Sequence, residues 1–426
     1  MKLTRREFMV GCSAAIAAMA GGRIGNLVFA QDSAAAAQRD ILVVVFLRGG
    51  CDSLNLIAPT NDANYVAARS SLRVTEAEGL DLKNPVQATA GFKFHPAAGG
   101  LKELYDGNAL AIIHACGLTN GTRSHFDAMD YIERGTPDNK NTPTGWITRM
   151  LTRMAPEGLI PAFASGSSVP DSLLNSTYAI AVGQKVQDFA LRNSPGRYAE
   201  RQTQILKQLY QQGDLPLHQS GLATLEAIET VQNKLPRDSD GNVIDYEPEP
   251  DAEYTEGGLS DALRRIAQII KLDIGLQVAT VDFGGWDTHD SQDRVFPARV
   301  EELSRSLNAF YDDLAAYHGR LTVVVMSEFG RRLKENRNGG TDHGHGGLLM
   351  LLGGNVQGGR MHGTWPGLAN EQLDRGVDLT VATDFRTVLS EVAIRRMATP
   401  YLSEIFPGFE NYQPLEVVTG TDLPIE

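Results

Sequence analysis

ILVVVFLRGGCDS, residues 41–53, is the stretch of this chain that decides its fold. Its first seven residues are continuously apolar and mostly β-branched, which is typical of a parallel strand buried on both faces. The run ends in Gly49 and Gly50 followed by polar residues, and open α/β sheets build their sites at that carboxyl edge. Asp52 is therefore a candidate metal ligand, with a turn aspartate that caps the next segment as the alternative.

Apolar runs of the same kind recur along the chain and alternate with segments of helical spacing. Further strands are expected in ALAIIHACG, IPAFASG, TYAIAV, LQVATVDF, LTVVVM and LLMLLGG, and helices at 145–154, 197–212, 222–234, 260–272, 299–318 and 383–397. Alternation at this rhythm predicts an α/β fold, a three-layer α/β/α sandwich with a largely parallel central sheet. A chain of 426 residues with 42% hydrophobic content can bury so large a core.

The first thirty residues have the layout of an export signal. Arg5 and Arg6, followed by Phe8 and an Ala- and Gly-rich stretch, fit the twin-arginine (Tat) signal peptide, and Val28-Phe29-Ala30 offers a cleavage site. We expect a signal peptide at 1–30, a linker at 31–39 and a single domain at 40–426, with an acidic loop insertion at about 235–258. The folded protein is then periplasmic or secreted. No other stretch is apolar enough to span a bilayer, so no transmembrane segment is expected in the mature chain.

Net charge and cysteine content indicate which partners and which thiol states are expected. The net charge of −13 becomes about −16 once four basic residues and one acidic residue leave with the signal. A chain this acidic is not expected to bind nucleic acid. Cys51 and Cys116 both follow strand-like runs, and an oxidising compartment leaves a disulfide and two buried thiols open as alternatives.

Carboxylates and imidazoles gather between residues 281 and 347, in glycine-rich turns that follow strand-like runs. They are Asp287 and His289 in VDFGGWDTHDS, Glu328 in SEFGR, and Asp342, His343 and His345 in TDHGHGG. Asp287 and His289 can converge on one ion, and His345, just before the LLMLLGG strand, could complete the set. Imidazole with carboxylate predicts a divalent metal, zinc before manganese, iron or calcium. Glu328 could instead pair with a following arginine, and His343 could orient a ligand from behind.

Arg123, Ser124 and His125 are the catalytic candidates, and they precede the helical pattern FDAMDYIERG. Ser124 stands where an N-cap is expected, because a serine oxygen accepts one of the free N–H groups of the first turn. In the functional interpretation, its hydroxyl beside Arg123 attacks an anionic ester that the helix dipole and the guanidinium attract. The two interpretations stay open.

The ordered set LRGGCDSLN, TRSHFDAMDYIERG, GGWDTH, SEFGR and DHGHGG, behind a twin-arginine leader, resembles the exported family called domain of unknown function 1501. That family is grouped with the alkaline-phosphatase and sulfatase superfamily. The resemblance implies an alkaline-phosphatase-like fold and metal-assisted hydrolysis of phosphate or sulfate esters. It implies Ser124 as nucleophile and Asp287, His289 and His345 as one metal site, with Glu328 in the place of an aspartate. Phe329 departs from the superfamily's histidine, and Arg48 from its first aspartate.

Two functions follow as expectations. The first is an exported metal-dependent hydrolase acting on a small anionic ester or on a sulfated or phosphorylated polymer, with Ser124 attacking. The second is a non-catalytic envelope scaffold that keeps this fold and binds another exported protein or a polysaccharide. Ligands missing from a second metal site favour the scaffold, whereas Ser124 and the clustered histidines favour the enzyme.

Overall fold

A nine-stranded sheet forms the centre of the computed structural model, with strand order β13-β5-β12-β9-β1-β8-β6-β7 and β14 also paired to β5. The structure describes residues 39–82, 91–156, 158–189, 196–213, 216–410 and 412–426. The strands of this sheet are β1 (Ile41–Leu47), β5 (Leu110–Gly117), β6 (Ala162–Ala164), β7 (Ala179–Ala181), β8 (Val278–Phe283), β9 (Leu321–Ser327), β12 (Gly347–Leu352), β13 (Met361–His362) and β14 (Thr383–Asp384).

The sheet is largely parallel, as predicted. β1 pairs in parallel with β8 and with β9, and β6 pairs in parallel with β7 and with β8. β12 is the exception, because it runs antiparallel to both of its neighbours, β5 and β9. A continuous apolar run such as LLMLL marks a buried strand but does not give its direction.

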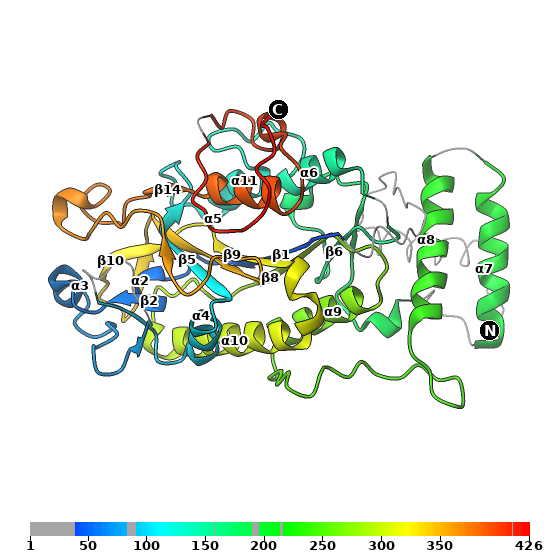
Figure 1. Cartoon of the computed structure of the whole chain (residues 1–426), viewed down its shortest axis with the longest axis horizontal. Helices are drawn as coiled ribbons and strands as arrows, with labels where there is room; N and C mark the ends of the chain where they lie inside the picture. The colour runs from blue at the N-terminus through cyan, green and yellow to red at the C-terminus, as the bar shows by residue number, and fades with distance from the viewer. Residues whose placement is uncertain (1–38, 83–90, 157, 190–195, 214–215, 411) are drawn as a thin grey trace.

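Helices cover both faces of this sheet (Figure 1). On one face lie α4 (Gly99–Asp106), α9 (Gly258–Lys271) and α10 (Gln292–Asp313), and on the other α5 (His125–Arg134), α6 (Trp146–Met154) and α11 (Phe385–Arg395). Because strand side chains alternate, Val43 and Val45 of β1 join one hydrophobic core while Val44 and Phe46 join the other. The predicted three-layer α/β/α sandwich is confirmed.

Smaller elements surround this sandwich. The sheet β2-β4-β3 is formed by Ile57–Pro59, Phe92–Phe94 and Leu80–Asp81, and the antiparallel pair β10-β11 by Arg331–Glu335 and Thr341–His343. The remaining α-helices are α2 (Ser53–Leu56), α3 (Ala63–Ala68), α7 (Gly196–Tyr210), α8 (Pro216–Lys234) and α12 (Leu402–Ile405). α7 and α8 pack side by side at one end of the molecule (Figure 1).

The acidic segment at 236–256 is fixed to the body at one buried carboxylate. Asp313, at the end of α10, accepts hydrogen bonds from the hydroxyls of Tyr246 and Tyr254 and from the backbone N–H of Glu249. Lys271 of α9 lies 2.8 Å from the same carboxylate. The segment is thus a surface loop with defined anchor points.

Cys51 and Cys116 are both buried free thiols, which settles the alternative left open by the sequence. Burial raises the pKa of each thiol, so both are protonated near neutral pH. Among the described residues, no helix combines the length and apolar character needed to cross a bilayer. The predicted signal peptide lies outside the described residues.

Candidate metal centre

Loops that follow β1, β8 and β9 meet the start of α5 and the hairpin β10-β11 at the carboxyl edge of the sheet. Glycines allow them to approach closely. A Cβ at Gly49, where φ is +122°, would lie 2.5 Å from the backbone nitrogen of Asp287. One at Gly340 would lie 2.4 Å from the backbone of His289. The glycine-rich turns are therefore what brings the polar residues together.

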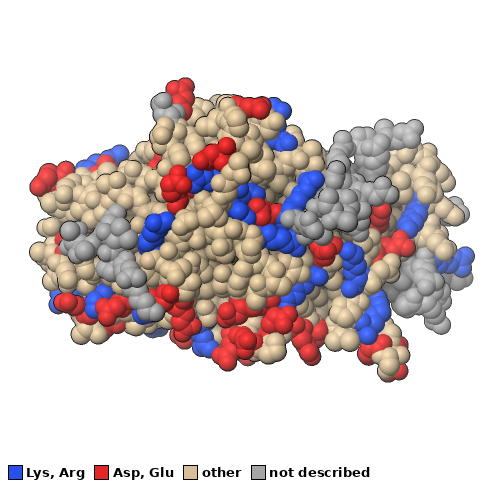
Figure 2. Space-filling model, in the orientation of Figure 1, with Lys and Arg blue, Asp and Glu red and all other residues tan. Residues whose placement is uncertain are grey.

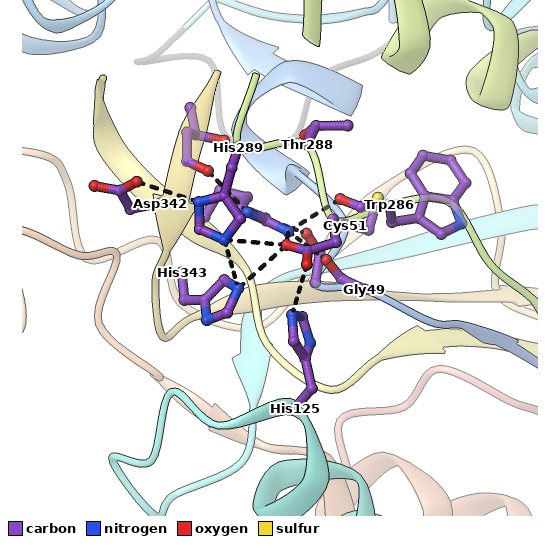
Figure 3. A network of polar contacts seen from close by, with 12 residues as sticks. Gly49, Cys51, His125, Trp286, Thr288, His289, Asp342 and His343 are labelled. Carbon is purple, nitrogen blue, oxygen red and sulfur yellow. Dashed lines mark hydrogen bonds and ion pairs between the residues drawn. The ribbon is translucent and has the colours of Figure 1, made fainter. Parts of the chain in front are cut away.

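Three imidazoles and one carboxylate converge at this edge (Figure 3). The Nε2 atom of His343 lies 2.8 Å from Nε2 of His289 and 3.2 Å from Oδ1 of Asp287. Nε2 of His289 is also 3.2 Å from that oxygen, and Nε2 of His125 is 3.4 Å from Oδ2 of Asp287. Ligand atoms of His125, Asp287 and His343 all lie within 4.8 Å of one another.

Each of these imidazoles is held from behind at Nδ1 by an oxygen. Nδ1 of His125 donates to Glu328 at 2.7 Å, and Nδ1 of His343 donates to the carbonyl of Arg123 at 2.7 Å. Nδ1 of His289 faces Asp342 at 3.3 Å. A carboxylate or carbonyl can only accept, so each Nδ1 carries the hydrogen. In the neutral tautomer, all three Nε2 lone pairs then point towards Asp287.

This donor set fits a divalent cation. A tetrahedral zinc ion with bonds of about 2.0–2.1 Å places its ligand atoms roughly 3.4 Å apart. The separations from Asp287 to the three imidazoles are close to this value, whereas the group whose ligand atoms all lie within 4.8 Å of one another holds His125, Asp287 and His343 without His289. Nε2 of His125 is buried and has no hydrogen-bond partner within the described part of the chain. Metal-binding histidines typically donate their second nitrogen to a carboxylate or a backbone carbonyl, as all three do here.

Asp287 remains ionised at this edge. Partial burial alone would raise the pKa of Asp287. The hydrogen bond and the charge of Arg331 outweigh this effect and lower the pKa of Asp287 to about 2. Arg331 is buried and lies 2.6 Å from Oδ1 of Asp287. The carboxylate is half-exposed, so it can face both the protein and a ligand from solvent.

Glu328 lies behind His125 and is fully buried. It accepts from the backbone N–H of Gly49 at 2.8 Å and from the hydroxyl of Ser327 at 3.0 Å. Burial opposes ionisation, but the hydrogen bond from His125 and those from the backbone lower the pKa of Glu328. The same contact raises the pKa of His125, whereas burial lowers that of His343. Glu328 therefore orients an imidazole, and it forms no ion pair with Arg331.

Ser124 caps α5, since its hydroxyl oxygen accepts from the N–H of Asp127 at 3.4 Å. Both chain neighbours of Ser124 nevertheless touch the imidazole cluster. The carbonyl of Arg123 holds His343, and the ring of His125 belongs to the cluster. The guanidinium of Arg123 binds Asp378, with Asp374 at 3.2 Å. Ser124 is thus the residue between two that touch the cluster, and its own oxygen caps α5.

Two residues predicted as ligands lie elsewhere. Asp52 is fully buried and binds Arg69 through both oxygens, one of them at 2.9 Å, with Gln292 as a third partner. His345 has both ring nitrogens engaged away from Asp287, Nδ1 with Asp374 at 3.1 Å and Nε2 with the carbonyl of Leu118 at 2.9 Å. The structure therefore does not bring His345 to Asp287 and His289, and it places His343 beside them instead.

His125 is the ligand candidate that the sequence did not identify as one. Its ring packs on Phe329 at a centroid distance of 4.9 Å and on His343 at 4.2 Å. Phe329 stands where the resembled superfamily has a histidine, and here the imidazole comes from α5 instead. The only sequence signal was the position of His125 directly after the expected N-cap.

A model of the family described as "Protein of unknown function (DUF1501)" matches residues 39–398 of the chain. No curated protein matches its sequence. The fold is similar to a protein in the alkaline phosphatase superfamily from Vibrio parahaemolyticus, with 11% identity, a TM-score of 0.35, and 84% of this chain and 71% of that one covered.

Two further solved structures show a similar degree of likeness. For PsFucS1 sulfatase from Pseudoalteromonas sp. the identity is 10% and the TM-score 0.33, covering 84% of this chain and 68% of that one. For the zinc complex of the C-terminal periplasmic domain of EptC from Escherichia coli, the identity is 8% and the TM-score 0.32, with 74% of each chain covered. Likeness this weak says nothing about the chemistry of the present chain.

Proposed function

We propose that this chain, which belongs to the DUF1501 family of proteins of unknown function, is a metal-dependent hydrolase of phosphate or sulfate esters. One observation carries the proposal. The Nε2 lone pairs of His125, His289 and His343 all face the carboxylate of Asp287, because every Nδ1 is committed to an oxygen behind it. Lone pairs that face one another repel unless a cation lies between them.

Protons are the alternative cation. With both Nδ1 hydrogens already donated, the 2.8 Å contact between Nε2 of His289 and Nε2 of His343 becomes a hydrogen bond only if one ring is protonated. Burial lowers the pKa of His343, which disfavours its charged form. A single divalent ion relieves the whole set, and imidazole with carboxylate suits zinc, manganese or iron.

The residues around the centre supply the rest of the chemistry. A divalent ion bound there would polarise a phosphoryl or sulfuryl oxygen and lower the pKa of a water or hydroxyl beside it. Arg331 keeps Asp287 ionised, and Glu328 fixes the ring of His125. Ser124 is the proposed nucleophile. Its oxygen accepts from the N–H of Asp127, and its hydroxyl also hydrogen-bonds the carboxylate of Asp127, which would take up the proton as the oxygen attacks the ester and the alcohol part leaves.

The substrate class follows from the resemblance of the motif set to the alkaline-phosphatase and sulfatase superfamily. We propose a small anionic ester or a sulfated or phosphorylated polymer. The twin-arginine pattern at 1–30 supports export of the folded protein to the periplasm or beyond. Export after folding would let the chain acquire its metal before it leaves the cytoplasm.

Metal content tests the centre without any substrate. The protein is purified after export and its metals are measured by mass spectrometry, for the wild type and for His343→Ala and His345→Ala. These two histidines form a matched pair two residues apart, His343 at the end of β11 and His345 just after it. We expect about one equivalent of metal in the wild type and in His345→Ala, and a loss of at least 10-fold in occupancy in His343→Ala. Equal content in the two variants would contradict the proposed ligand set.

Turnover tests the hydrolase. Arylphosphates and arylsulfates are assayed with Ser124→Gly and Ser124→Thr. Glycine is tolerated at an N-cap at a cost of only a few tenths of a kcal/mol, so the first variant removes the hydroxyl while keeping the helix. We expect loss of turnover with glycine and partial retention with threonine. A metal-loaded protein that hydrolyses none of these esters would leave the non-catalytic scaffold as the better description.

A further inference from the structure

A cavity of about 200 Å³ lies between helix α9, the acidic segment at 236–256 and the 3-10 helix η3 (Val186–Asp188) that follows β7. Its charged and amide lining includes Lys185, Asp245, Asp261, Arg264, Arg265 and Gln268. These residues are distinct from those of the metal centre. The cavity is therefore a separate place where a ligand could bind, and its size suits a small group.

Two neighbouring arginines of α9 line this cavity, and neutral groups hold them in place. Nε of Arg265 donates to the hydroxyl of Ser165 at 3.1 Å, and that hydroxyl donates to the carbonyl of Ala262. The guanidinium of Arg264 lies over the ring of Tyr254, 5.2 Å from the ring centre. In the described part of the chain, neither arginine has a carboxylate within 4.0 Å. Both guanidinium charges are thus positioned but not neutralised by an ion pair.

The nitrogens at the ends of both side chains open into the cavity. Nε of Arg264 is fully enclosed, but its two terminal nitrogens keep accessible surface and have no hydrogen-bond partner among the described residues. The terminal nitrogens of Arg265 share both properties. Gln268 lies one helical turn after Arg264, on the same face of α9. It is only 5% exposed, yet its amide atoms also keep accessible surface and lack a partner within the described ranges. All three polar groups therefore end in the cavity that they line.

The other charges at the cavity do not cancel these two. Lys185 and Asp245 form an ion pair at 3.2 Å, and both side chains are exposed, so the pair contributes little. Burial lowers the pKa of Arg265, and the charge of Asp261 opposes this only in part. The lining holds three cations against two carboxylates, in a chain whose net charge is −13. Asp and Glu gather along the lower edge of the face in Figure 2. A basic cavity in so acidic a chain indicates a site for an anion.

We propose that this cavity binds the sulfate or phosphate group of an anionic ligand, independently of the metal centre. The planar fork of a guanidinium matches two oxygens of such a group, and two arginines side by side can hold it from two directions. The terminal nitrogens of Arg264 and Arg265 would donate to its oxygens, and Nε2 of Gln268 would add a neutral donor. Lys185 would add charge at the mouth. A free inorganic ion and a sulfated or phosphorylated sugar share this chemistry.

Isothermal titration calorimetry on the full chain tests the site, with metal removed by a chelator so that the metal centre takes no part. The probes are inorganic sulfate, inorganic phosphate, glucose 6-sulfate, glucose 6-phosphate and glucose. We expect saturable binding of at least one anion and none of glucose. A sugar ester that binds at least 10-fold more tightly than its inorganic ion identifies the sugar as part of the ligand, whereas equal affinity identifies the free ion. No saturable binding of any anion up to about 10 mM would overturn the proposal.

Variants make the test specific. Arg264→Gln and Arg265→Gln each remove one cation, and we expect each to weaken binding at least 10-fold. Gln268→Leu keeps the side-chain size and breaks no hydrogen bond within the described chain, so it should fold and weaken binding several-fold. Arg305→Gln is the matched control, because it removes the same charge from an exposed position on α10 and should leave binding unchanged.

A change at the metal centre separates this site from the proposed hydrolase. His343→Ala should bind the anion as the wild type does, even if it has lost its metal. Binding that disappears in His343→Ala would place the anion at the metal centre instead. Unaltered affinity in both Arg264→Gln and Arg265→Gln would likewise overturn the site, whether or not the protein hydrolyses esters.

Discussion

Nδ1 of His125, at the start of α5, lies 2.7 Å from Oε1 of Glu328, which follows β9. The two residues are 203 positions apart in the sequence. Glu328 is itself fixed by the N–H of Gly49 and the hydroxyl of Ser327. The carboxylate therefore aligns the imidazole of His125 with the proposed metal centre and also joins three loops of the sheet edge.

Glu328→Gln should weaken metal binding by about 10- to 100-fold, because an amide orients and polarises the imidazole of His125 less well than a carboxylate. The fold should survive, since glutamine has the same shape. Metal affinity is measured by competition with a chelator of known affinity. Glu335→Gln, on β10, is the matched control, because Glu335 binds the 70–72 turn. Equal affinity in the two variants would show that Glu328 does not act on the metal centre.

The strands and their parallel sheet were predictable from the sequence because apolar runs report burial directly. The proposed ligand set was only partly predictable. When two histidines are two residues apart, the direction in which each imidazole points depends on the turn between them. β11 ends at His343, and Gly344 then packs against the backbone of Arg331, where a Cβ would lie 2.4 Å from its carbonyl carbon. The chain turns there, so His345 faces Asp374 while His343 faces Asp287.

The location of Asp52, predicted as a metal ligand, could not be foreseen for a different reason, because the sequence did not reveal its partner Arg69. Its position after a strand and a Gly-Gly turn was interpreted as a site, yet Arg69 neutralises it in the core. The two residues are 17 positions apart, with α2, β2 and α3 between them, and nothing in the local pattern of either residue indicates the pairing. Long-range ion pairs of this kind become visible only once the loops are placed.

Arg331→Met should destabilise the protein by about 3–5 kcal/mol. The guanidinium is buried and donates to backbone carbonyls of Gly49, Gly50, Trp286 and Thr341 as well as to Asp287. Methionine would leave these acceptors without partners. Urea unfolding in the presence of a chelator measures the change without any contribution from metal. Arg337→Ala, in the exposed turn after β10, should stay within about 0.5 kcal/mol of the wild type.

His114 should make stability fall in acid. It is buried on β5, where Nε2 faces the carbonyl of Ile57 at 3.1 Å and Nδ1 accepts from the N–H of Ala115. Burial lowers the pKa of His114 to about 4 from an ordinary value near 6.5. Above pH 6.5 neither state is protonated, and between about 6.5 and 4 only the unfolded chain gains the proton. Folding therefore loses up to about 3 kcal/mol over this window.

Chemical unfolding of chelator-treated protein at pH 7.5 and pH 5 measures this loss. His114→Gln retains a donor and an acceptor but does not titrate, so its stability should depend less on pH than that of the wild type. An identical pH dependence in wild type and His114→Gln would show that another group controls the acid loss.

Asp313→Ala should release the acidic segment at 236–256 from the body. The carboxylate is buried and accepts from two tyrosine hydroxyls and one backbone N–H of that segment, and it lies next to Lys271. Its removal takes this acceptor from both tyrosine hydroxyls and from the N–H of Glu249, while Lys271 keeps its contact with the side chain of Glu249. The segment should therefore be cut by protease at least 10-fold faster at matched global stability. Asp312→Ala is the adjacent control, because the carboxylate of Asp312 contacts only Asn308 on its own helix among the hydrogen bonds of the described residues. Limited proteolysis followed by mass spectrometry locates the cuts. Equal cleavage in the two variants would mean that packing of the tyrosine rings, and not the buried carboxylate, holds the segment in place.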